Sequence, residues 1–319
     1  MPLGEFDLIA KYFTRPVKRA LLGIGDDCAL LAPAPGTQLA VSSDMLVDGR
    51  HFLSTVAPER LGHKALAVNL SDLAACGATP LAFTLALALP RADEVFLQGF
   101  SEGLFALADE HHCELIGGDT TQGPLNICIT VFGEVPVGRA LLRSGAHAGD
   151  DIYVSGTVGD ARLALEVFRG TATLPGVDFE AVRFAMEQPQ PRVALGQALR
   201  GVASSAIDVS DGLLGDLSHI LRRSDVGATL NVDSVARSVV LSRQPQALQR
   251  ECTLAGGDDY ELVFTAPPRN ASAVDAAARL SGVLVTRIGV IEVGKGLRLL
   301  DAQGRPVANT FGSFDHFKT

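Results

Sequence analysis

The sequence predicts an α/β (α+β) protein made of two domains. Patterns typical of strands alternate with patterns typical of helices along the whole chain. The chain has 319 residues, 47% of them apolar, which suffices for a substantial core and favours about two domains. Glycine and proline interrupt the pattern between Val135 and Gly149, before a new strand begins at Asp151. We therefore expect one domain over residues 1–137 and a second over residues 138–319.

In the N-terminal half, alternating or β-branched segments predict strands at residues 39–43, 81–89 and 125–135. Apolar residues at helical spacing predict helices at residues 58–76 and 92–111. In the C-terminal half, the same criteria predict strands at residues 151–155, 260–265 and 283–291, and helices at residues 160–168, 192–199, 211–223 and 270–280. Residues 171–191 have the character of a variable insertion, and their role cannot be predicted.

Glycine followed at once by aspartate occurs at four places in the chain. These are Gly25-Asp26-Asp27, Gly118-Asp119, Gly159-Asp160 and Gly257-Asp258-Asp259. Glycine lets the backbone turn sharply, so we expect four corners at the ends of strands that bring carboxylates from distant elements together. Carboxylates in such number cannot all stay ionised without cations. Magnesium with a polyphosphate is the expected combination.

The expected helix at 58–76 is almost wholly apolar except for Asn69, Ser71 and Asp72. A helix that is apolar on all sides is buried, so Asn69 and Asp72, three residues apart on one face, should be polar groups inside the protein. A single buried aspartate more often caps or hydrogen-bonds a neighbouring loop. Together with the other aspartates of the chain, Asp72 is better interpreted as a metal ligand.

The segment Ile207-Asp208-Val209-Ser210-Asp211-Gly212 is expected to join the end of a strand to the start of a helix. N-capping alone explains Ser210 or Asp211 but not Asp208. Alternatively, two carboxylates beside a serine at a helix N-terminus place a metal-bound phosphate against free backbone N–H groups. Both interpretations stay open on this segment alone.

Two further features are candidates for phosphate contacts. Gly117, Gly118 and Asp119 form either an ordinary corner between a strand and a loop, or a phosphate contact in which Asp119 holds magnesium. Arg143 is either a solvated side chain or a fork donor to phosphate at the domain junction. The sequence contains no G-x-x-x-x-G-K-[ST] motif. A nucleotide would therefore be held through carboxylate-bound magnesium and not by a lysine-containing loop.

Composition and patterning exclude several classes of protein. The net charge is −9 and the basic residues are scattered, which argues against a nucleic-acid surface. No apolar run of membrane-spanning length and no signal-peptide pattern occur, so we expect no membrane association and a cytoplasmic location. Five cysteines, odd in number and without C-x-x-C spacing, predict buried free thiols and not disulfides or a zinc site.

The motifs together resemble the thiamine-monophosphate kinase family over almost the whole chain. The segments that carry the resemblance include Gly23-Ile24-Gly25-Asp26-Asp27-Cys28, Ser42-Ser43-Asp44-Met45-Leu46, Asn69-Leu70-Ser71-Asp72-Leu73, Gly117-Gly118-Asp119-Thr120-Thr121, Ser210-Asp211-Gly212-Leu213 and Gly256-Gly257-Asp258-Asp259-Tyr260-Glu261-Leu262. This family belongs to the superfamily of aminoimidazole ribonucleotide synthetase. The resemblance implies a mixed-sheet N-terminal domain for ATP, metal and dimerisation, an α/β C-terminal domain that completes the cleft, and a homodimer joined through N-terminal strands.

The resemblance also implies a reaction and a set of site residues. The reaction is magnesium-dependent, direct in-line transfer of the ATP γ-phosphate to thiamine monophosphate, giving thiamine diphosphate and ADP. Several magnesium ions would be held by Asp27, Ser42, Ser43, Asp44, Asp72, Asp119, Asp208 and Asp211. The catalytic residues among these would be Asp27, Asp44, Asp72, Asp119 and Asp211. ATP would contact Gly118, Asp119, Arg143 and Ser210, and the thiamine substrate would contact His51, Asp258 and Phe311.

Three positions depart from the commonest family pattern. Ser43 stands where threonine is frequent, and it keeps the hydroxyl. Asp258 stands where glutamate is usual and is shorter by one methylene group. Phe311 stands where tryptophan is often found, and its ring attracts the cationic thiazolium less strongly. Two rival functions are another ATP-dependent enzyme of the same superfamily and a non-catalytic sensor of magnesium and nucleotide.

Overall fold

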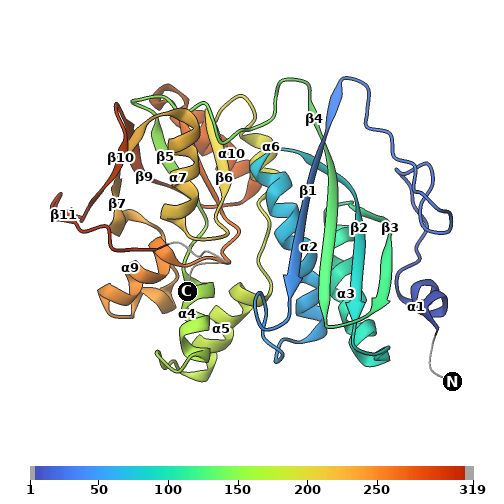
Figure 1. The fold of residues 1–319 in the computed structure, drawn as a ribbon. Coiled ribbons are helices and arrows are strands. Elements are labelled where there is room, and N and C mark those ends of the chain that lie inside the picture. The colour runs from blue at the N-terminus through green and yellow to red at the C-terminus, as the bar shows by residue number, and fades with distance from the viewer. Residues whose placement is uncertain (1–3, 313–319) are drawn as a thin grey trace. The chain divides into compact units, whose positions relative to one another are not determined.

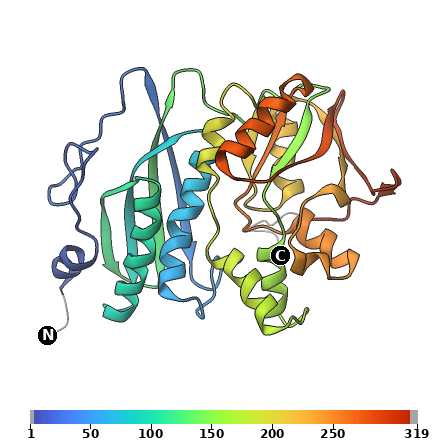
Figure 2. The same ribbon diagram turned by 180° about the vertical axis from the view of Figure 1, so that it is seen from behind.

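The computed structural model describes residues 4–312, which form two compact units. The N-terminal unit contains the residues up to 73 together with 78–138. The C-terminal unit contains residues 74–77 together with those from 139 onward. Figures 1 and 2 show the chain from opposite sides, and each unit has its own sheet and its own helices.

From residue 4 onward, the sheet of the N-terminal unit has four strands. They are β1 (Thr37–Val47), β2 (Thr79–Leu89), β3 (Glu114–Gln122) and β4 (Asn126–Pro136), in the order β1-β4-β2-β3. Strands β1 and β2 run antiparallel to β4, whereas β2 and β3 are parallel. The predicted mixed sheet is therefore confirmed, and β1 and β3 are its two edges.

Two long helices, α2 (Pro58–Ala75) and α3 (Glu94–Glu110), lie against one face of this sheet (Figures 1 and 2). The Asp93 side chain caps α3 by accepting the N–H groups of Val95 and Phe96, each at 3.2 Å. On the opposite face, Val17 and Leu31 pack near β2 and β3. A short helix, α1 (Glu5–Tyr12), precedes this segment.

Up to residue 312, the sheet of the C-terminal unit has seven strands in the order β11-β10-β7-β9-β5-β8-β6. Only β7 and β10 are parallel, and the other neighbouring strands are antiparallel. The strands are β5 (Asp151–Ser155), β6 (Ser205–Asp208), β7 (Gly227–Asn231), β8 (Leu262–Ala266), β9 (Val285–Glu292), β10 (Gly296–Leu300) and β11 (Pro306–Val307).

Helix α7 (Leu213–Ser224) covers one face of this sheet and α10 (Ala271–Ser281) the other, as the two opposite views show. Leu213, Leu217 and Ile220 of α7 are fully buried in the core, because they recur at helical spacing on one side of the helix. The remaining helices are α4 (Asp160–Phe168), α5 (Gly176–Glu187), α6 (Val193–Ala198), α8 (Val239–Ser242) and α9 (Gln246–Ala255).

Residues 171–191, for which no element was predicted, contain helix α5, which packs against α4 around the ring contact of Phe168 with Phe179 (centroids 5.2 Å apart). One sequence expectation about the elements is wrong. The four expected corners do not all form at strand ends. Gly118-Asp119 lies inside β3, and Gly257-Asp258 follows helix α9 and not a strand. Gly159-Asp160, in contrast, follows β5 and starts α4, as expected.

The cysteines and the helix lengths can also be compared with the expectations. All five thiols are free, as predicted, but Cys28 is exposed, so the prediction of burial is wrong for it. Burial raises the pKa of the Cys252 thiol to about 12. Among residues 4–312, no helix is both long enough and apolar enough to cross a membrane.

Candidate active site

In the N-terminal unit, three of the predicted metal ligands gather between β1 and α2. Ser42 and Asp44 alternate with Ser43 along β1 and so share one face of the strand. This face is turned to α2, because the Ser42 hydroxyl donates a 2.5 Å hydrogen bond to Asp72 Oδ2. The backbone N–H of Asp44 donates to Asn69 Oδ1 at 3.1 Å. Two side chains of one helix therefore hold this stretch of the strand.

Asn69 explains why the buried face of α2 is polar at this point. It is 1% exposed, and its Nδ2 donates to the carbonyl of Ala65 one turn earlier, at 3.0 Å. That bond fixes the amide so that Oδ1 is directed at Asp44. The expectation of buried polar groups on α2 is confirmed for Asn69, whereas Asp72 is half-buried.

Ser43 and Asp119 lie on the other face of the sheet. The Ser43 hydroxyl donates to the carbonyl of Ile129 at 3.1 Å and lies 3.0 Å from the hydroxyl of Thr130. Asp119 is in register with Ala86 of β2, which is in register with Cys128 of β4 and then with Met45 of β1. The side chains of one such row share a face. Asp119 is therefore on the Ser43 side and exposed.

The width of the sheet also separates Asp119 from the Ser42–Asp72 pair. Asp44, Ile129, Leu85 and Gly118 form one row across the four strands. Three steps between strands correspond to about 14 Å from the backbone of Asp44 to that of Gly118. Asp119 and the Ser42–Asp72 pair therefore do not form one compact ligand shell within this chain.

Gly118 is required by the close pairing of β3 with β2. Its φ is +146°, and a Cβ at this position would lie 1.9 Å from the carbonyl oxygen of Leu85. The glycine is thus explained by strand pairing, and the expected corner at this position is not present.

Asp27 and His51 occupy irregular segments of the same unit. Asp27 is exposed in the segment before β1. His51 follows β1, and its Nδ1 accepts the backbone N–H of Val47 at 3.0 Å. A ring nitrogen that accepts carries no proton, so the proton of the neutral ring is on Nε2. The ring of His51 is therefore fixed in orientation and tautomer.

In the C-terminal unit, the loop between β6 and α7 carries Ser210 and Asp211. One buried carboxylate organises this loop. Oδ2 of Asp216, a residue of the first turns of α7, accepts the backbone N–H groups of Ser210, Asp211 and Gly212 at 3.0, 3.1 and 3.1 Å. Burial raises the pKa of Asp216 to about 7, although the three N–H donors act in the opposite direction and lower it. The N–H groups expected to be free for a phosphate are therefore already used, which corrects that expectation.

A second loop is joined to the first by backbone hydrogen bonds. The N–H of Asp258 donates to the carbonyl of Ser210, and that of Tyr260 to the carbonyl of Val209, both at 2.9 Å. Gly257 permits this approach, since a Cβ there would lie 2.3 Å from the Ser210 carbonyl oxygen. Asp258 has a left-handed φ of +67°, and its Oδ1 accepts the Tyr260 hydroxyl at 3.0 Å.

The other predicted residues of this unit have distinct environments. Asp208 is buried at the end of β6. Arg143 is exposed. Burial lowers the pKa of His219 on α7, the positive charges of Arg222 and Arg143 lower it further, and Asp211 opposes this shift. Arg143 and Asp211 thus act on the same imidazole. Phe311 is partly buried against the core that α7 covers.

The donor set fits magnesium by its chemistry. All candidate ligands offer hydroxyl or carboxylate oxygens, which are the ligands of hard divalent cations. Within residues 4–312, however, no three histidine, cysteine, aspartate or glutamate side chains converge as a preformed metal site. The expected convergence of carboxylates is thus not observed among these residues, and the candidate donors are the Ser42–Asp72 pair of the N-terminal unit and the Asp208–Asp211 segment of the C-terminal unit.

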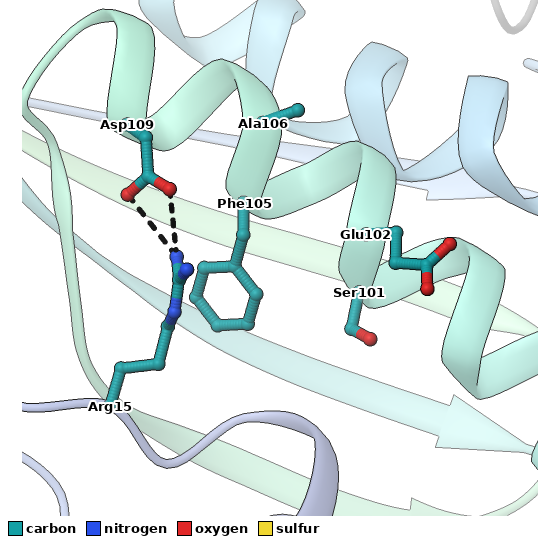
Figure 3. A pocket seen from close by; sticks show the side chains of 6 residues that line it. All are labelled: Arg15, Ser101, Glu102, Phe105, Ala106 and Asp109. Carbon is teal, nitrogen blue, oxygen red and sulfur yellow. Dashed lines mark hydrogen bonds and ion pairs between the residues drawn. The ribbon is translucent and has the colours of Figure 1, made fainter.

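A shallow hollow beside α3 has a different character (Figure 3). Its lining includes Arg15, Phe105 and Asp109. The Arg15 guanidinium lies 4.2 Å from the Phe105 ring centroid and donates to both carboxylate oxygens of Asp109, at 3.1 and 3.2 Å. This cation is already paired, and the hollow contains none of the predicted site residues.

Sequence patterns did not predict the role of Asp216. Asp216 is the fourth residue of α7, where a side chain can face either the solvent or the core. Its spacing of four residues from Gly212 is the sequence feature that is consistent with the observed contact. A carboxylate that reaches back to the loop before its own helix resembles an N-cap, but it lies beyond the usual capping position.

Comparisons with known proteins place the chain in a class. Residues 25–135 match the AIR synthase related protein N-terminal domain, and residues 147–302 match the corresponding C-terminal domain. The fold is thus that of the AIR synthase related class.

More similar proteins narrow this assignment. Thiamine-monophosphate kinase of Escherichia coli K12 is 47% identical, over 100% of both chains. The crystal structure of thiamine-monophosphate kinase from Stenotrophomonas maltophilia has a TM-score of 0.85 and 45% identity, covering 94% of this chain and 95% of that one. AaThiL complexed with AMPPCP and TMP has a TM-score of 0.77 and 29% identity, covering 90% and 89%. The chain belongs to the thiamine-monophosphate kinase family.

Proposed function

We propose that this protein transfers the γ-phosphate of ATP directly to thiamine monophosphate, in line and with magnesium, giving thiamine diphosphate and ADP. The single observation that carries the proposal is the 47% identity to a thiamine-monophosphate kinase over the full length of both chains. The complex of a related protein with AMPPCP and TMP supports the same pair of substrates.

The chemistry of the acceptor explains what the site has to do. A phosphate oxygen is already anionic near neutral pH, so it needs no general base. The obstacle is the repulsion between two phosphorylated molecules that must approach in line. The protein therefore contributes mainly by neutralising charge and by orienting the two substrates.

In the N-terminal unit, Ser42, Asp44 and Asp72 form the best-organised oxygen donor group. The Ser42–Asp72 hydrogen bond and the Asn69 contact to Asp44 fix these donors before any ligand binds. Magnesium bound to such oxygens supplies positive charge that offsets the repulsion between phosphates. The proposed metal ligands of the whole chain are Asp27, Ser42, Ser43, Asp44, Asp72, Asp119, Asp208 and Asp211.

In the C-terminal unit, the joined loops supply side chains for both substrates. Ser210 would contact ATP through its hydroxyl, because its N–H donates to Asp216. Asp258 would contact the thiamine substrate, and it is attached to Ser210 by a backbone hydrogen bond. The remaining proposed contacts are Gly118, Asp119 and Arg143 for ATP, and His51 and Phe311 for the thiamine substrate.

A homodimer through β1 is proposed from the exposure of that strand. Leu39, Val41 and Met45 lie on one face of an edge strand and are 45%, 55% and 52% exposed. A row of apolar side chains on a sheet edge is a typical surface for pairing with another chain. Sedimentation of the purified protein tests this proposal, and a monomer at micromolar concentration would contradict it. The cytoplasmic location stays a prediction.

Incubation of the purified protein with ATP, magnesium and thiamine monophosphate tests the function. Thiamine diphosphate should form in equal amount to ADP. ADP formation with a different acceptor would indicate another enzyme of the superfamily, and binding of ATP without turnover would indicate a sensor. Labelled ATP should leave no stable phosphorylated protein, because the proposed transfer is direct.

A further inference from the structure

We infer that Asp216 is a positioning residue that fixes the Ser210–Gly212 loop in the conformation that binds the magnesium nucleotide. The inference rests on the proposed function, in which Ser210 and Asp211 contact the nucleotide and its metal. Asp216 itself is not placed to bind the nucleotide, since its carboxylate accepts hydrogen bonds from the loop backbone and the residue is 3% exposed.

The convergence of three amides on one oxygen defines the loop. Consecutive N–H groups of Ser210, Asp211 and Gly212 can all reach Asp216 Oδ2 only when the backbone curls around it. Such a concave set of amides at a helix start is a natural site for a phosphate. Here a side chain of the same chain fills it, so the loop is shaped before any ligand arrives.

Several other backbone groups of the loop also have partners within the unit. The N–H of Val209 donates to the carbonyl of Glu261 at 2.8 Å, and the carbonyl of Gly212 accepts the N–H of Asp216 at 2.9 Å. The carbonyls of Val209 and Ser210 accept from the Gly257–Tyr260 loop. With these groups used, the nucleotide can be recognised here through the side chains of Ser210 and Asp211, whose directions depend on the loop backbone.

The positioning role of Asp216 can be tested because asparagine keeps a side-chain oxygen that can accept hydrogen bonds, whereas alanine has none. In Asp216→Asn a carbonyl oxygen remains to accept the three N–H groups, whereas in Asp216→Ala they lose their acceptor. Supporting groups around a metal site typically contribute about 10–100-fold to affinity. We therefore expect Asp216→Ala to weaken binding of magnesium-AMPPCP by about 10–100-fold, and Asp216→Asn to stay close to wild type.

Isothermal titration calorimetry of the full chain with magnesium-AMPPCP, well below the melting temperature, measures this difference. Asp150→Ala is the matched control, because Asp150 is also a buried carboxylate that holds a loop of this unit. It is 5% exposed and accepts the His147 N–H at 3.0 Å and the Ser204 hydroxyl at 2.6 Å. The control should lose stability but keep its affinity for the nucleotide.

Each outcome decides the inference. Loss of affinity in Asp216→Ala with rescue in Asp216→Asn supports it, and unchanged affinity in Asp216→Ala overturns it. If Asp216→Ala does not fold, Asp216→Glu replaces it, since the longer side chain displaces the acceptor oxygen. Weak binding by that variant supports the inference, and wild-type binding overturns it. A wild-type chain that binds no magnesium-AMPPCP overturns the proposed function itself, a result distinct from any of these.

Discussion

The hydroxyl of Ser42 and the carboxylate of Asp72 are joined by a 2.5 Å hydrogen bond that links strand β1 to helix α2. The two residues are 30 positions apart in the sequence and come from different kinds of element. Their oxygens nevertheless lie side by side on the α2 face of the sheet, next to Asp44. This contact fixes two of the proposed metal donors relative to each other.

Replacing Asp72 with asparagine should abolish turnover without unfolding the protein. The change removes a negative charge and a strong oxygen ligand but keeps the size of the side chain, so we expect a fall of about 100-fold or more. Steady-state formation of thiamine diphosphate measures it. The control is Asp109→Asn, which changes a carboxylate of α3 that is paired with Arg15 (Figure 3). This variant should leave turnover unchanged. Near-normal activity of Asp72→Asn would remove this residue from the site.

Asn69→Ala should lower both stability and the apparent affinity for magnesium. The variant removes the side-chain acceptor of the Asp44 N–H, which costs about 1–3 kcal/mol, whereas the Ala65 carbonyl keeps its helical backbone donor. Urea unfolding and the magnesium dependence of turnover measure the two effects. In the control Asn270→Ala, which loses a 2.8 Å bond to Val202, only stability should fall. An unchanged magnesium dependence in Asn69→Ala would limit Asn69 to a structural role.

Gly118→Ala should be strongly destabilising. The added Cβ meets the Leu85 carbonyl at 1.9 Å on a backbone with φ of +146°, so we expect a loss of about 2–5 kcal/mol. Gly123→Ala is the matched control, because its Cβ would meet only the Ala88 side chain, at 3.6 Å. Thermal unfolding of both variants gives the comparison. Equal melting temperatures would show that β2 and β3 are not paired as described.

Asp259→Asn should stabilise the protein increasingly as the pH rises. Burial raises the pKa of the Asp259 carboxyl well above its usual value. The hydrogen bond that it accepts from the Gly159 N–H, at 2.8 Å, acts in the opposite direction and does not offset this shift. Its Oδ2 has no hydrogen-bond partner among residues 4–312. The pKa of Asp259 in the folded protein exceeds its pKa in the unfolded chain. Ionisation therefore lowers the stability at pH values above the unfolded pKa, and asparagine, which does not ionise, removes this loss.

Melting temperatures of wild type and Asp259→Asn between about pH 4 and pH 7 test this expectation. The difference between the two proteins should grow towards neutral pH. Asp233→Asn is a control of opposite sign, because the hydrogen-bonded Arg250 lowers the pKa of Asp233 and its charge therefore stabilises the fold at neutral pH. A constant difference for Asp259→Asn across this range would mean that its carboxyl titrates normally in the fold.

Much of the fold could be predicted from local patterns. The burial of α2, the helical spacing of Leu213, Leu217 and Ile220, and the alternation in β4 are all visible in the sequence. Strand β3 is not among the predicted strands, because Gly117-Gly118-Asp119-Thr120-Thr121 is polar and rich in glycine. Backbone pairing with β2 makes this segment a strand although its own residues do not favour one. The sequence of the segment alone does not indicate that partner strand.

The candidate site could be predicted by residue type but not by arrangement. The motifs identified Ser42, Asp44 and Asp72, but only the strand register shows that Ser43 and Asp119 belong to the opposite face. Similarly, Ser210 and Asp211 suggested a phosphate site at a helix start, whereas Asp216 fills that position. These relationships depend on side chains and strands that meet only after folding.

The proposed function requires that Asp72 and Asp211 each bind divalent cations that accompany the nucleotide. Electron paramagnetic resonance of Mn²⁺, titrated into the protein with AMPPCP, tests it most directly on wild type, Asp72→Asn and Asp211→Asn. We predict that each substitution lowers the affinity for nucleotide-dependent Mn²⁺. Wild-type Mn²⁺ binding in either variant would contradict the account.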